Sequence, residues 1–554
     1  MSHALALADE YWDYYRATAQ LWNIDRGDVD QIEHWEDLSP AGVARRLERL
    51  ASFAARSREL ATSAELNDLD RGLLGAVEFS ADSTSVLLPF ERDLGLVAGP
   101  FDFATFVTIL VPGYSLTTRA HGQGYVAKLS AIPAFVDGWI AGLRDGAASG
   151  RSATARGIAG SVAALDGILS LEPADHPLAA QDPPSQLSES EIATWRSQID
   201  DTIRTTTQPA LAQLRAFLHD ELLPIGRPDD RCGVCHMPGG DEGYAGVLWA
   251  STSTELTARE VHEVGLRQLG LLDQEYRELG AEATGTSDPV SLRERLRTDM
   301  SLRYTAPEEI AAAAMAALAR AEDASGDWFV RLPRGRCNAV AVASGPMAFY
   351  TGPSPDGNRG GTFFYNTANT SAWTRFQLEV TTFHEAVPGH HLQVALAGEY
   401  DLHPVVGELE VTSYGEGWGL YAERLADEMG LYSSPLQRIG MLTLDSLRAA
   451  RLVVDTGVHA LGWTRDEAIE FIIGNTTMDR GMAATEVDRY VAQPGQATSY
   501  MIGRLEIDRL RRRAADALGP RFSIKEFHDV VLGNGMTPLG QLAHNVDAWT
   551  AAHG

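Results

Sequence analysis

The stretch His384-Glu385-Ala386-Val387-Pro388-Gly389-His390-His391 combines a His-Glu pair with two further histidines a few residues later. Imidazole nitrogens hold zinc in proteins, and a carboxylate beside the metal handles protons, so this combination is typical of zinc hydrolysis. The common His-Glu-x-x-His spacing would place the second ligand at position 388, where this chain has proline. One of the two later histidines must therefore take over that role.

The segment around these residues is predicted to be an interrupted helix. Apolar residues recur at helical spacing over residues 373–398, and His384 and Glu385 lie in the middle of this stripe. Pro388 lacks a backbone donor, and its ring clashes with the carbonyl four residues earlier. We therefore expect a kink or bulge at the Pro388-Gly389 pair.

The interruption decides which histidine is the second ligand. In a regular helix His391 shares the face of His384 but lies two turns, about 10 Å, further along the axis. His390 comes close enough to His384 along the helix axis to share a metal ion only if the chain loops out at the Pro-Gly pair. We favour His384 and His390 as zinc ligands and keep His391 as the alternative. The histidine that does not bind is expected to orient a ligand or to contact substrate.

A third ligand is predicted on a following helix. Glu416 lies 26 residues after His390 and is flanked by small residues, which let a metal or another helix approach closely. Glu423, seven residues later, lies on the same helical face and is predicted to support a ligand from behind. Glu408 and Glu410 compete with Glu416 but fall in an acidic helix start that is expected to be exposed. The alternative is a set of core histidines satisfied by ordinary hydrogen bonds.

The composition fits a folded enzyme that does not bind polyanions. The chain has 554 residues, of which 44% are hydrophobic, so a large core is available. Its 46 basic and 75 acidic residues give a net charge of −29, which disfavours nucleic acids and anionic membranes. The first residues lack the basic start and apolar core of a signal peptide, and no uninterrupted apolar run is long enough to span a bilayer. These features predict a cytoplasmic enzyme.

The cysteines do not indicate a disulfide framework. Three in so long a chain are too few for a set of structural disulfides. Cys232-Gly233-Val234-Cys235-His236 matches the c-type haem attachment pattern, but haem attachment normally follows export, and a second cysteine pair for a zinc site is missing. We interpret it as a chance pair in a loop, with adventitious metal or redox chemistry as the alternative.

Helical periodicity dominates the rest of the chain. Helices are predicted at residues 40–63, 187–223, 255–283, 305–322, 374–398, 408–429, 435–462 and 496–517. Thr257 is a predicted N-cap, with Glu260 completing a capping box. Strand patterns fall at 338–343 and 361–366. We expect a mainly α protein with an N-terminal helical region over residues 1–230 and a catalytic, metal-binding region over residues 231–554, or one continuous two-lobed domain.

Four stretches resemble a known bacterial family. Residues 383–393, 414–423, 451–459 and 493–500 are similar to the domain of unknown function DUF885, which is grouped with the gluzincin-type zinc peptidases. The resemblance covers most of the chain and is weakest toward its beginning. It implies a large helical two-lobed metallopeptidase-like fold with a small antiparallel sheet beside the metal-binding helix. It does not give the substrate.

The resemblance also implies residues that touch the substrate. Gluzincins have an edge strand before the metal helix that can pair with an extended peptide, and residues 363–366 occupy that place. Asn366 at the end of this strand is a predicted substrate-binding residue, and Arg359 in the preceding loop is predicted to hold a carboxylate. Turn chemistry is the alternative for both.

Related zinc peptidases stabilise the oxyanion with a tyrosine or histidine beyond the metal helices, which makes Tyr500 and His459 the candidates here. Arg451, Asp455 and His459 are spaced by four residues and form one helical stripe. A buried ion-pair network is therefore the alternative role for this stripe, and we favour it slightly.

Together these features predict a zinc-dependent hydrolase of peptide or amide bonds that acts on small peptides. His384, His390 and Glu416 would bind Zn²⁺, and Glu385 would take a proton from water and pass it to the leaving amine. The alternatives are a structural zinc protein, whose closed shell should include His391, and a two-His-one-Glu iron oxygenase. No nucleic-acid or membrane partner is expected, and the sequence does not give the oligomeric state.

Overall fold

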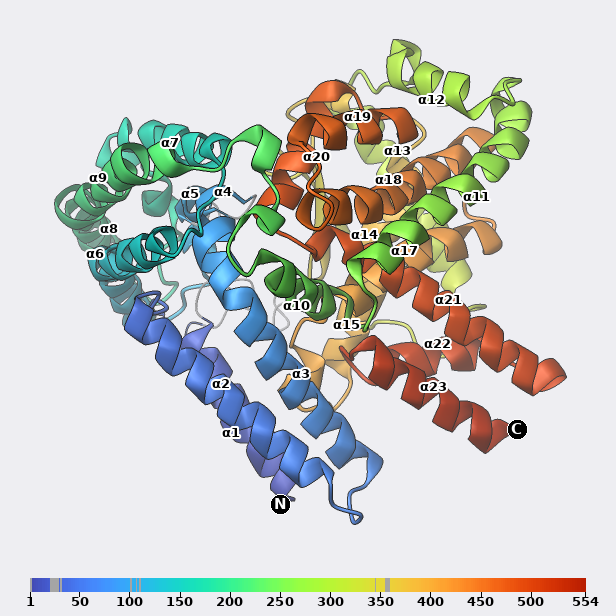
Figure 1. Cartoon of the computed structure of the whole chain (residues 1–554), viewed down its shortest axis with the longest axis horizontal. Coiled ribbons are helices and arrows are strands. Elements are labelled where there is room, and N and C mark those ends of the chain that lie inside the picture. Colours follow the sequence, from blue (N-terminus) through green and yellow to red (C-terminus); the bar gives the residue numbers. More distant parts are fainter. Residues whose placement is uncertain are drawn as a thin grey trace.

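The structure is a computed structural model that describes residues 2–19, 29, 32–99, 102–105, 107–108, 111–343, 345–353 and 359–554. It is mainly α, as predicted, with a small sheet (Figure 1). The helices before the sheet are α1 (His3–Thr18), α2 (Pro40–Ala61), α3 (Asp68–Phe90), α4 (Leu96–Ala98), α5 (Phe103–Thr105), α6 (Arg119–Ala148), α7 (Ala155–Leu169), α8 (Glu189–Thr202), α9 (Gln208–Phe217), α10 (Gly240–Thr252), α11 (Ala258–Thr284), α12 (Pro289–Thr298) and α13 (Pro307–Ser325). The strands are β1 (Asn338–Val342), β2 (Ala348–Thr351) and β3 (Thr362–Asn366). The helices after the sheet are α14 (Leu378–Glu385), α15 (His390–Glu399), α16 (Pro404–Gly407), α17 (Thr412–Glu428), α18 (Pro435–His459), α19 (Arg465–Asn475), α20 (Arg480–Ala492), α21 (Ser499–Leu518), α22 (Ile524–Leu532) and α23 (Leu539–His553).

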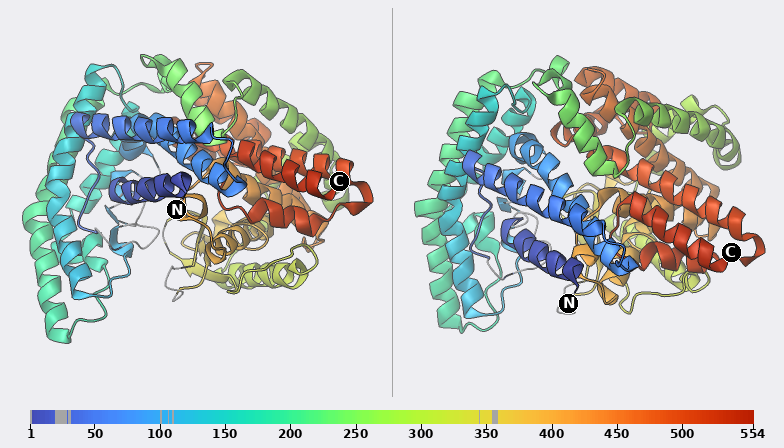
Figure 2. Two further views of the ribbon diagram at one scale, coloured as in Figure 1. Left: turned by 90° about the horizontal axis from the view of Figure 1, so that it is seen from below. Right: turned by 60° about the horizontal axis from the view of Figure 1, so that its bottom comes forward.

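The N-terminal helices form a layer beside the C-terminal half of the molecule (Figures 1 and 2). One hydrophobic cluster draws on residues between 32 and 244, and another on residues between 248 and 546. A third cluster joins α1, α2 and α3 to α16 through Val405 and Val406. The two large cores thus follow the two halves of the chain, while the third connects them. The boundary at residue 230 stays a prediction.

α18 is the central helix of the C-terminal half. All of its residues from Asp445 to His459 are buried. α11, α14, α17, α19, α20 and α21 pack on it, so it is surrounded by other helices (Figure 1). Charged and polar groups buried in this way are costly unless they are paired. The partners of the α18 side chains therefore largely determine how these helices are held together.

β3 is the central strand of the sheet, whose order is β1-β3-β2. β1 pairs with it in parallel, with Asn338 opposite Thr362, and β2 pairs with it antiparallel, with Ala348 opposite Tyr365. The small sheet is thus mixed, with one antiparallel and one parallel pair. The prediction that residues 363–366 form an edge strand for a peptide is wrong, because both sides of this strand are already occupied.

The predicted interruption of the metal helix is a complete break. α14 ends and α15 begins on either side of a turn at Pro388-Gly389. A Cβ on Gly389 would lie 1.9 Å from the carbonyl oxygen of His384, so only glycine fits this turn. Trp418 of α17 donates from Nε1 to the carbonyl oxygen of Pro388 at 3.0 Å, which fixes the turn against α17.

Other local predictions are confirmed. Thr257 caps α11, and Glu260 closes the predicted capping box. α2, α11, α13, α17, α18 and α21 fall on predicted helical segments, and β1 and β3 fall on the two predicted strands. Local periodicity and capping chemistry therefore located these elements correctly.

Among the described residues, α6 is the helix long and apolar enough, by length and composition alone, to cross a membrane. Half of its most apolar window is buried, and Leu129 and Trp139 lie in the N-terminal hydrophobic cluster. A core helix has the same properties, so this is only a weak indication of a membrane span.

Candidate metal centre

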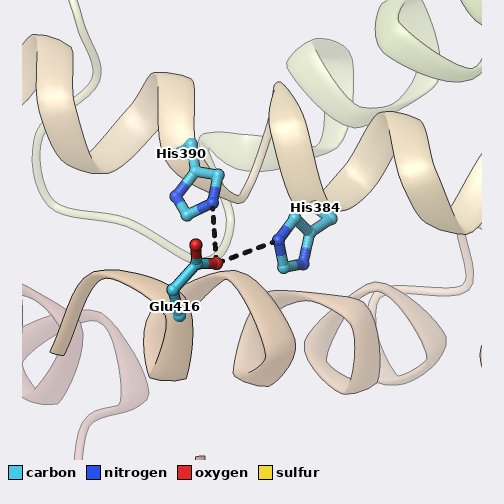
Figure 3. Close-up of side chains that lie close together, drawn as sticks. All are labelled: His384, His390 and Glu416. Carbon is cyan, nitrogen blue, oxygen red and sulfur yellow. Dashed lines mark ion pairs between the residues drawn. The ribbon is translucent and has the colours of Figure 1, made fainter. Parts of the chain in front are cut away.

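Three predicted ligands from three helices converge at one point. Figure 3 shows His384 of α14 and His390 of α15 pointing toward Glu416 of α17. Nε2 of His384 lies 3.5 Å from Oε2 of Glu416, and Nε2 of His390 lies 3.4 Å from the same oxygen. In the described part of the chain, this trio is the group whose ligand atoms, all within 4.8 Å of one another, could hold a metal ion.

These separations fit a shared metal ion. Ligand atoms about 2.1 Å from a tetrahedral zinc lie about 3.4 Å from one another. Oε2 of Glu416 is buried and has no hydrogen-bond partner, which is costly for a carboxylate oxygen unless a cation or a proton lies close by. Two imidazoles and one carboxylate suit zinc, and they also suit non-haem iron.

Glu423 supports His384 from the side opposite to Glu416. Its Oε1 accepts a hydrogen bond from Nδ1 of His384 at 2.8 Å, and its side chain is fully buried. This bond places the hydrogen on Nδ1 and leaves the lone pair of Nε2 for a metal. A Cβ on Gly419 would lie 2.7 Å from Cε1 of His384, so the imidazole lies against α17 because that position carries no side chain.

The carboxylates and imidazoles strongly influence one another. Burial acts to raise the pKa of Glu416, but the close approach of the His384 and His390 imidazoles holds that pKa well below its usual value. Burial acts to lower the pKa of His384, but Glu416 and Glu423 raise it to about 9. Burial raises the pKa of Glu385, against the opposing effect of the two imidazoles. A raised carboxyl pKa is a property that suits a general base and acid near neutral pH.

Tyr500, at the start of α21, lies beside the trio. Its ring is nearly parallel to that of His384, at an angle of 20°, with 6.5 Å between the ring centroids. Its hydroxyl oxygen accepts a long hydrogen bond of 3.5 Å from Arg489. Because the hydroxyl accepts that bond, its own hydrogen can be donated to another oxygen.

His391 points away from the trio. Its Nε2 donates to the carbonyl oxygen of Gly335 at 3.0 Å, and its Nδ1 accepts from the hydroxyl of Tyr350 at 3.0 Å. Both nitrogens are therefore used in linking α15 to β2 and to the segment before β1. This geometry favours His390 over His391 as the second ligand.

His459 is committed to the protein core. The backbone N–H of Val234 donates to its Nδ1 at 3.2 Å, so Nε2 carries the hydrogen and donates it to the carbonyl oxygen of Tyr490 at 2.9 Å. The side chain is fully buried, and burial lowers its pKa to about 3. Its only N–H is thus already used, and the structure gives no support to His459 as an oxyanion donor.

The other members of the α18 stripe are also paired within the core. Arg451 donates to Glu486 of α20, and Asp455 accepts from the hydroxyl of Tyr244 at 2.6 Å and from the backbone of Gly495 at 3.0 Å. The stripe therefore makes buried polar contacts with neighbouring elements, which is the alternative that we favoured for it.

The two predicted substrate-binding residues make local contacts. Asn366 donates from Nδ2 to the carbonyl oxygen of Gly345 at 2.8 Å, and its Oδ1 accepts from the N–H of Ala368 at 2.9 Å. Arg359 is exposed and donates to the carbonyl oxygen of Gly352 at 3.1 Å. Residues 354–358, which precede it, lie outside the described residues. The bond from the N–H of Ala368 to Asn366 is the turn chemistry that was the alternative for Asn366, and contact of either side chain with a substrate stays a prediction.

Sequence reasoning missed three residues near the centre. Arg448 lies 3.6 Å from Glu423, and Glu486 and Arg489 of α20 reach the neighbourhood of Tyr500. Arg448 stands one turn before Arg451 on α18, so the same helical stripe continues toward the metal ligands rather than only away from them.

The family is shown by comparison of the sequence with known families. The family model described as "Bacterial protein of unknown function (DUF885)" matches residues 21–546 of the sequence. The chain belongs to the DUF885 family. This confirms the family resemblance and leaves the biochemical activity open. No match is found among curated proteins.

Two solved structures share the fold of this DUF885 protein. A "putative lipoprotein" from Colwellia psychrerythraea is 24% identical with a TM-score of 0.90, and the alignment covers 100% of both chains. A "putative lipoprotein of unknown function" from Shewanella oneidensis is 17% identical with a TM-score of 0.73, covering 98% of this chain and 99% of the other. Lipoproteins are anchored to membranes, so these relatives contradict the prediction of a cytoplasmic enzyme.

A more distant likeness involves a Pyrococcus furiosus carboxypeptidase, in a structure described as "Apo-Mg". It is 11% identical with a TM-score of 0.33, over 92% of this chain and 97% of the other. A likeness this low carries no argument about function.

Proposed function

We propose that this DUF885 protein is a zinc-dependent hydrolase of peptide or amide bonds. The main support is the convergence of His384, His390 and Glu416 at ligand spacing, with Glu385 directly after a ligand in the chain. Three protein ligands leave the fourth position of a tetrahedral zinc to water or substrate, which is typical of catalytic zinc sites.

The neighbouring residues suit the steps of such a hydrolysis. A bound zinc ion would polarise the attacking water and the substrate carbonyl. Glu385 takes the proton of the water and delivers it to the leaving amine, and burial keeps its pKa high enough for it to act in both directions. Tyr500 donates its hydroxyl hydrogen to the carbonyl oxygen as that oxygen gains negative charge.

A substrate peptide needs a strand to pair with, and β2 takes the place that β3 was expected to fill. β2 lies at the antiparallel edge of the sheet and packs against α14 and α15. Its Tyr350 contacts His391, the residue next to a ligand. An extended peptide paired with this edge would run beside the metal-binding helices.

The two alternatives make different predictions. A structural zinc site would use a fourth protein ligand, and His391 was the candidate, but both of its nitrogens bond elsewhere. An iron oxygenase would use the same three ligands without needing Glu385. Metal analysis of the protein purified without added metal separates iron from zinc.

The test is digestion of a peptide library by the wild type and by Glu385→Gln, with products read by mass spectrometry. The wild type is expected to cut peptides, and Glu385→Gln is expected to keep its zinc and lose about two to four orders of magnitude in rate. Glu399→Gln, at the end of α15 where Glu399 accepts from the backbone of Arg334, is the matched control. A zinc-loaded wild type that cuts no peptide or amide would contradict the proposal.

A further inference from the structure

The arginines around Tyr500 point to the substrate class. Resting on the function proposed above, we propose that Arg489, together with Arg448 on the same tyrosine, binds the C-terminal carboxylate of the peptide substrate. The enzyme then releases the last residue of the peptide. The contacts of these arginines carry this inference, and they are independent of the metal ligands.

Three guanidinium groups meet at Tyr500. The Cζ atoms of Arg451 and Arg448 lie 4.8 Å and 5.6 Å from the centre of its ring. Arg489 reaches its hydroxyl at 3.5 Å. The ring of Tyr500 in turn lies 6.5 Å from that of His384, so Tyr500 stands between these positive charges and a metal ligand.

The carboxylates that contact these arginines most closely already have other partners. Arg451 is fully engaged by Glu486, at 2.8 Å. Arg489 has only a longer contact of 3.7 Å with the same carboxylate. Arg448 lies 3.6 Å from Glu423, which already accepts a short bond from a metal ligand. Glu486 and Glu423 therefore already have closer partners than Arg489 and Arg448.

The other carboxylates near Arg448 leave part of its guanidinium group unpaired. Glu385 and Asp445 both interact with Arg448, but Asp445 accepts from Arg424 at 2.5 Å and lies 3.6 Å from Arg504. Nε of Arg448 is buried and has no hydrogen-bond partner. A buried, charged donor without an acceptor is costly, and an anion that enters this region would satisfy it.

A peptide carboxylate fits this pair of arginines by geometry and by position. Planar guanidinium groups bind carboxylates with paired hydrogen bonds, and these charge-assisted bonds are the stronger kind. The side chain of Arg489 is 21% exposed, so a ligand can reach it, while Gln496 holds one of its nitrogens at 2.5 Å. Because both arginines contact Tyr500, which lies beside His384, a carboxylate held there would bring the last peptide bond of the substrate close to the centre.

The resulting reaction is hydrolysis of the last peptide bond of the substrate. The oxygen of water bonds to the carbonyl carbon of the last peptide bond, and the C–N bond breaks. Glu385 moves one water proton to the leaving nitrogen. The products are a peptide shortened by one residue, which has a new carboxylate, and a free amino acid whose original carboxylate still contacts Arg489.

The test measures binding and cleavage of two probes, N-acetyl-tetraalanine with a free C-terminal carboxylate and the same peptide as its C-terminal amide. Calorimetric binding is measured with the full-length, zinc-loaded Glu385→Gln protein, so that bound peptide is not cut. The free acid is expected to bind about 10- to 100-fold more tightly than the amide. Adding Arg489→Met should remove that difference, Arg489→Lys should restore part of it, and Arg480→Met, an exposed arginine on the same helix, should leave it unchanged.

The outcomes separate this inference from the proposed hydrolysis. Equal binding of acid and amide, binding of neither, or selectivity that survives Arg489→Met overturns the carboxylate site. Release of single C-terminal alanine by the wild type supports both claims. Acid-selective binding without any cleavage supports the carboxylate site and overturns the hydrolase. Cleavage of acid and amide at equal rates overturns the carboxylate site and keeps the hydrolase.

Discussion

His384 lies between Glu416 and Glu423, and this position ties metal binding to pH. Burial disfavours the protonated imidazole, but the two carboxylates raise its pKa to about 9. Zinc binds only the neutral imidazole, so a proton must leave before the metal can bind. Apparent zinc affinity should therefore rise by about tenfold per pH unit below that pKa and level off above it. Chelator-competition titrations across this range measure the slope, and a flat profile would show that His384 is not a ligand.

Glu423 fixes the orientation of His384, so its loss should weaken metal binding without removing a ligand. Glu423→Gln is expected to lower zinc affinity by about 10- to 100-fold, because the amide is a weaker partner for Nδ1–H. Glu428→Gln is the control, since Glu428 lies on the same helix and pairs with Arg511 at the surface. Equal zinc affinity in both variants, measured by chelator competition, would rule out this role.

At the scale of single residues, the sequence predicted the metal ligands better than it predicted the residues that surround them. The choice of His390 followed from the proline at the usual ligand position, and Glu416 and Glu423 followed from their spacing on one helix face. Arg448 could not be found in the same way, because its importance depends on Tyr500, a residue of another helix. His459 carries the right chemical group, but only the structure shows that Val234 and Tyr490 use both of its nitrogens.

At the scale of secondary-structure elements, the break between α14 and α15 brings His390 within reach of Glu416. Gly389→Ala would place a Cβ 1.9 Å from the carbonyl oxygen of His384, so the turn must open and displace one ligand from the other. We expect at least about a tenfold loss of zinc affinity, similar to the loss of a supporting contact. Gly398→Ala, on the exposed face of α15 where a Cβ meets nothing, should bind zinc like the wild type. Unchanged affinity in Gly389→Ala would show that the turn does not set the ligand geometry.

The sheet shows why some elements could not be predicted. β1 and β3 carry recognisable strand patterns, and both were located. β2 is only four residues long and follows Gly345-Pro346-Met347, so its own sequence gives little strand signal. Its place beside β3 depends on pairing between distant segments, and local periodicity does not encode such pairing. The central position of β3 was missed for that reason.

For the whole molecule, α18 links the two halves of the chain. Its end is held by the segment that follows residue 230, through Val234, and by Tyr244 of α10, through Asp455. At its other side Arg448 reaches Glu423, which supports a metal ligand. One buried helix therefore connects the N-terminal layer, the metal centre and the arginines near Tyr500. Helical periodicity located this helix, but its polar partners come from elements far apart in sequence and so lay beyond local patterns.

This arrangement makes the contribution of His459 to the stability of the fold depend on pH. Burial lowers the pKa of His459 to about 3 in the folded protein, while the unfolded chain keeps a histidine pKa near 6.5. The unfolded state then binds the extra proton, so the contribution of His459 is fully present above about pH 6.5 and is lost as the pH falls toward 3. The loss amounts to about 1.4 kcal/mol per pH unit. Asp455 acts in the opposite direction, because burial raises its pKa to about 7, and it offsets most of this loss in wild-type protein between about pH 6.5 and 4.

Comparison of His459→Gln with the wild type isolates the histidine, because Asp455 is present in both. The variant should be less stable at pH 7.5, where it lacks a well-placed pair of hydrogen bonds. As the pH falls from 6.5 to 4.5, its urea midpoint should rise relative to that of the wild type, because it keeps Asp455 and lacks the histidine. His553→Gln, at the exposed C-terminal end of α23, is the control and should keep the wild-type profile. Parallel stability profiles for His459→Gln and the wild type would mean that His459 takes up a proton in the folded state. The contacts of α18 with Val234 and Tyr490 would then have to rearrange in acid, because a doubly protonated imidazole cannot accept the bond from Val234.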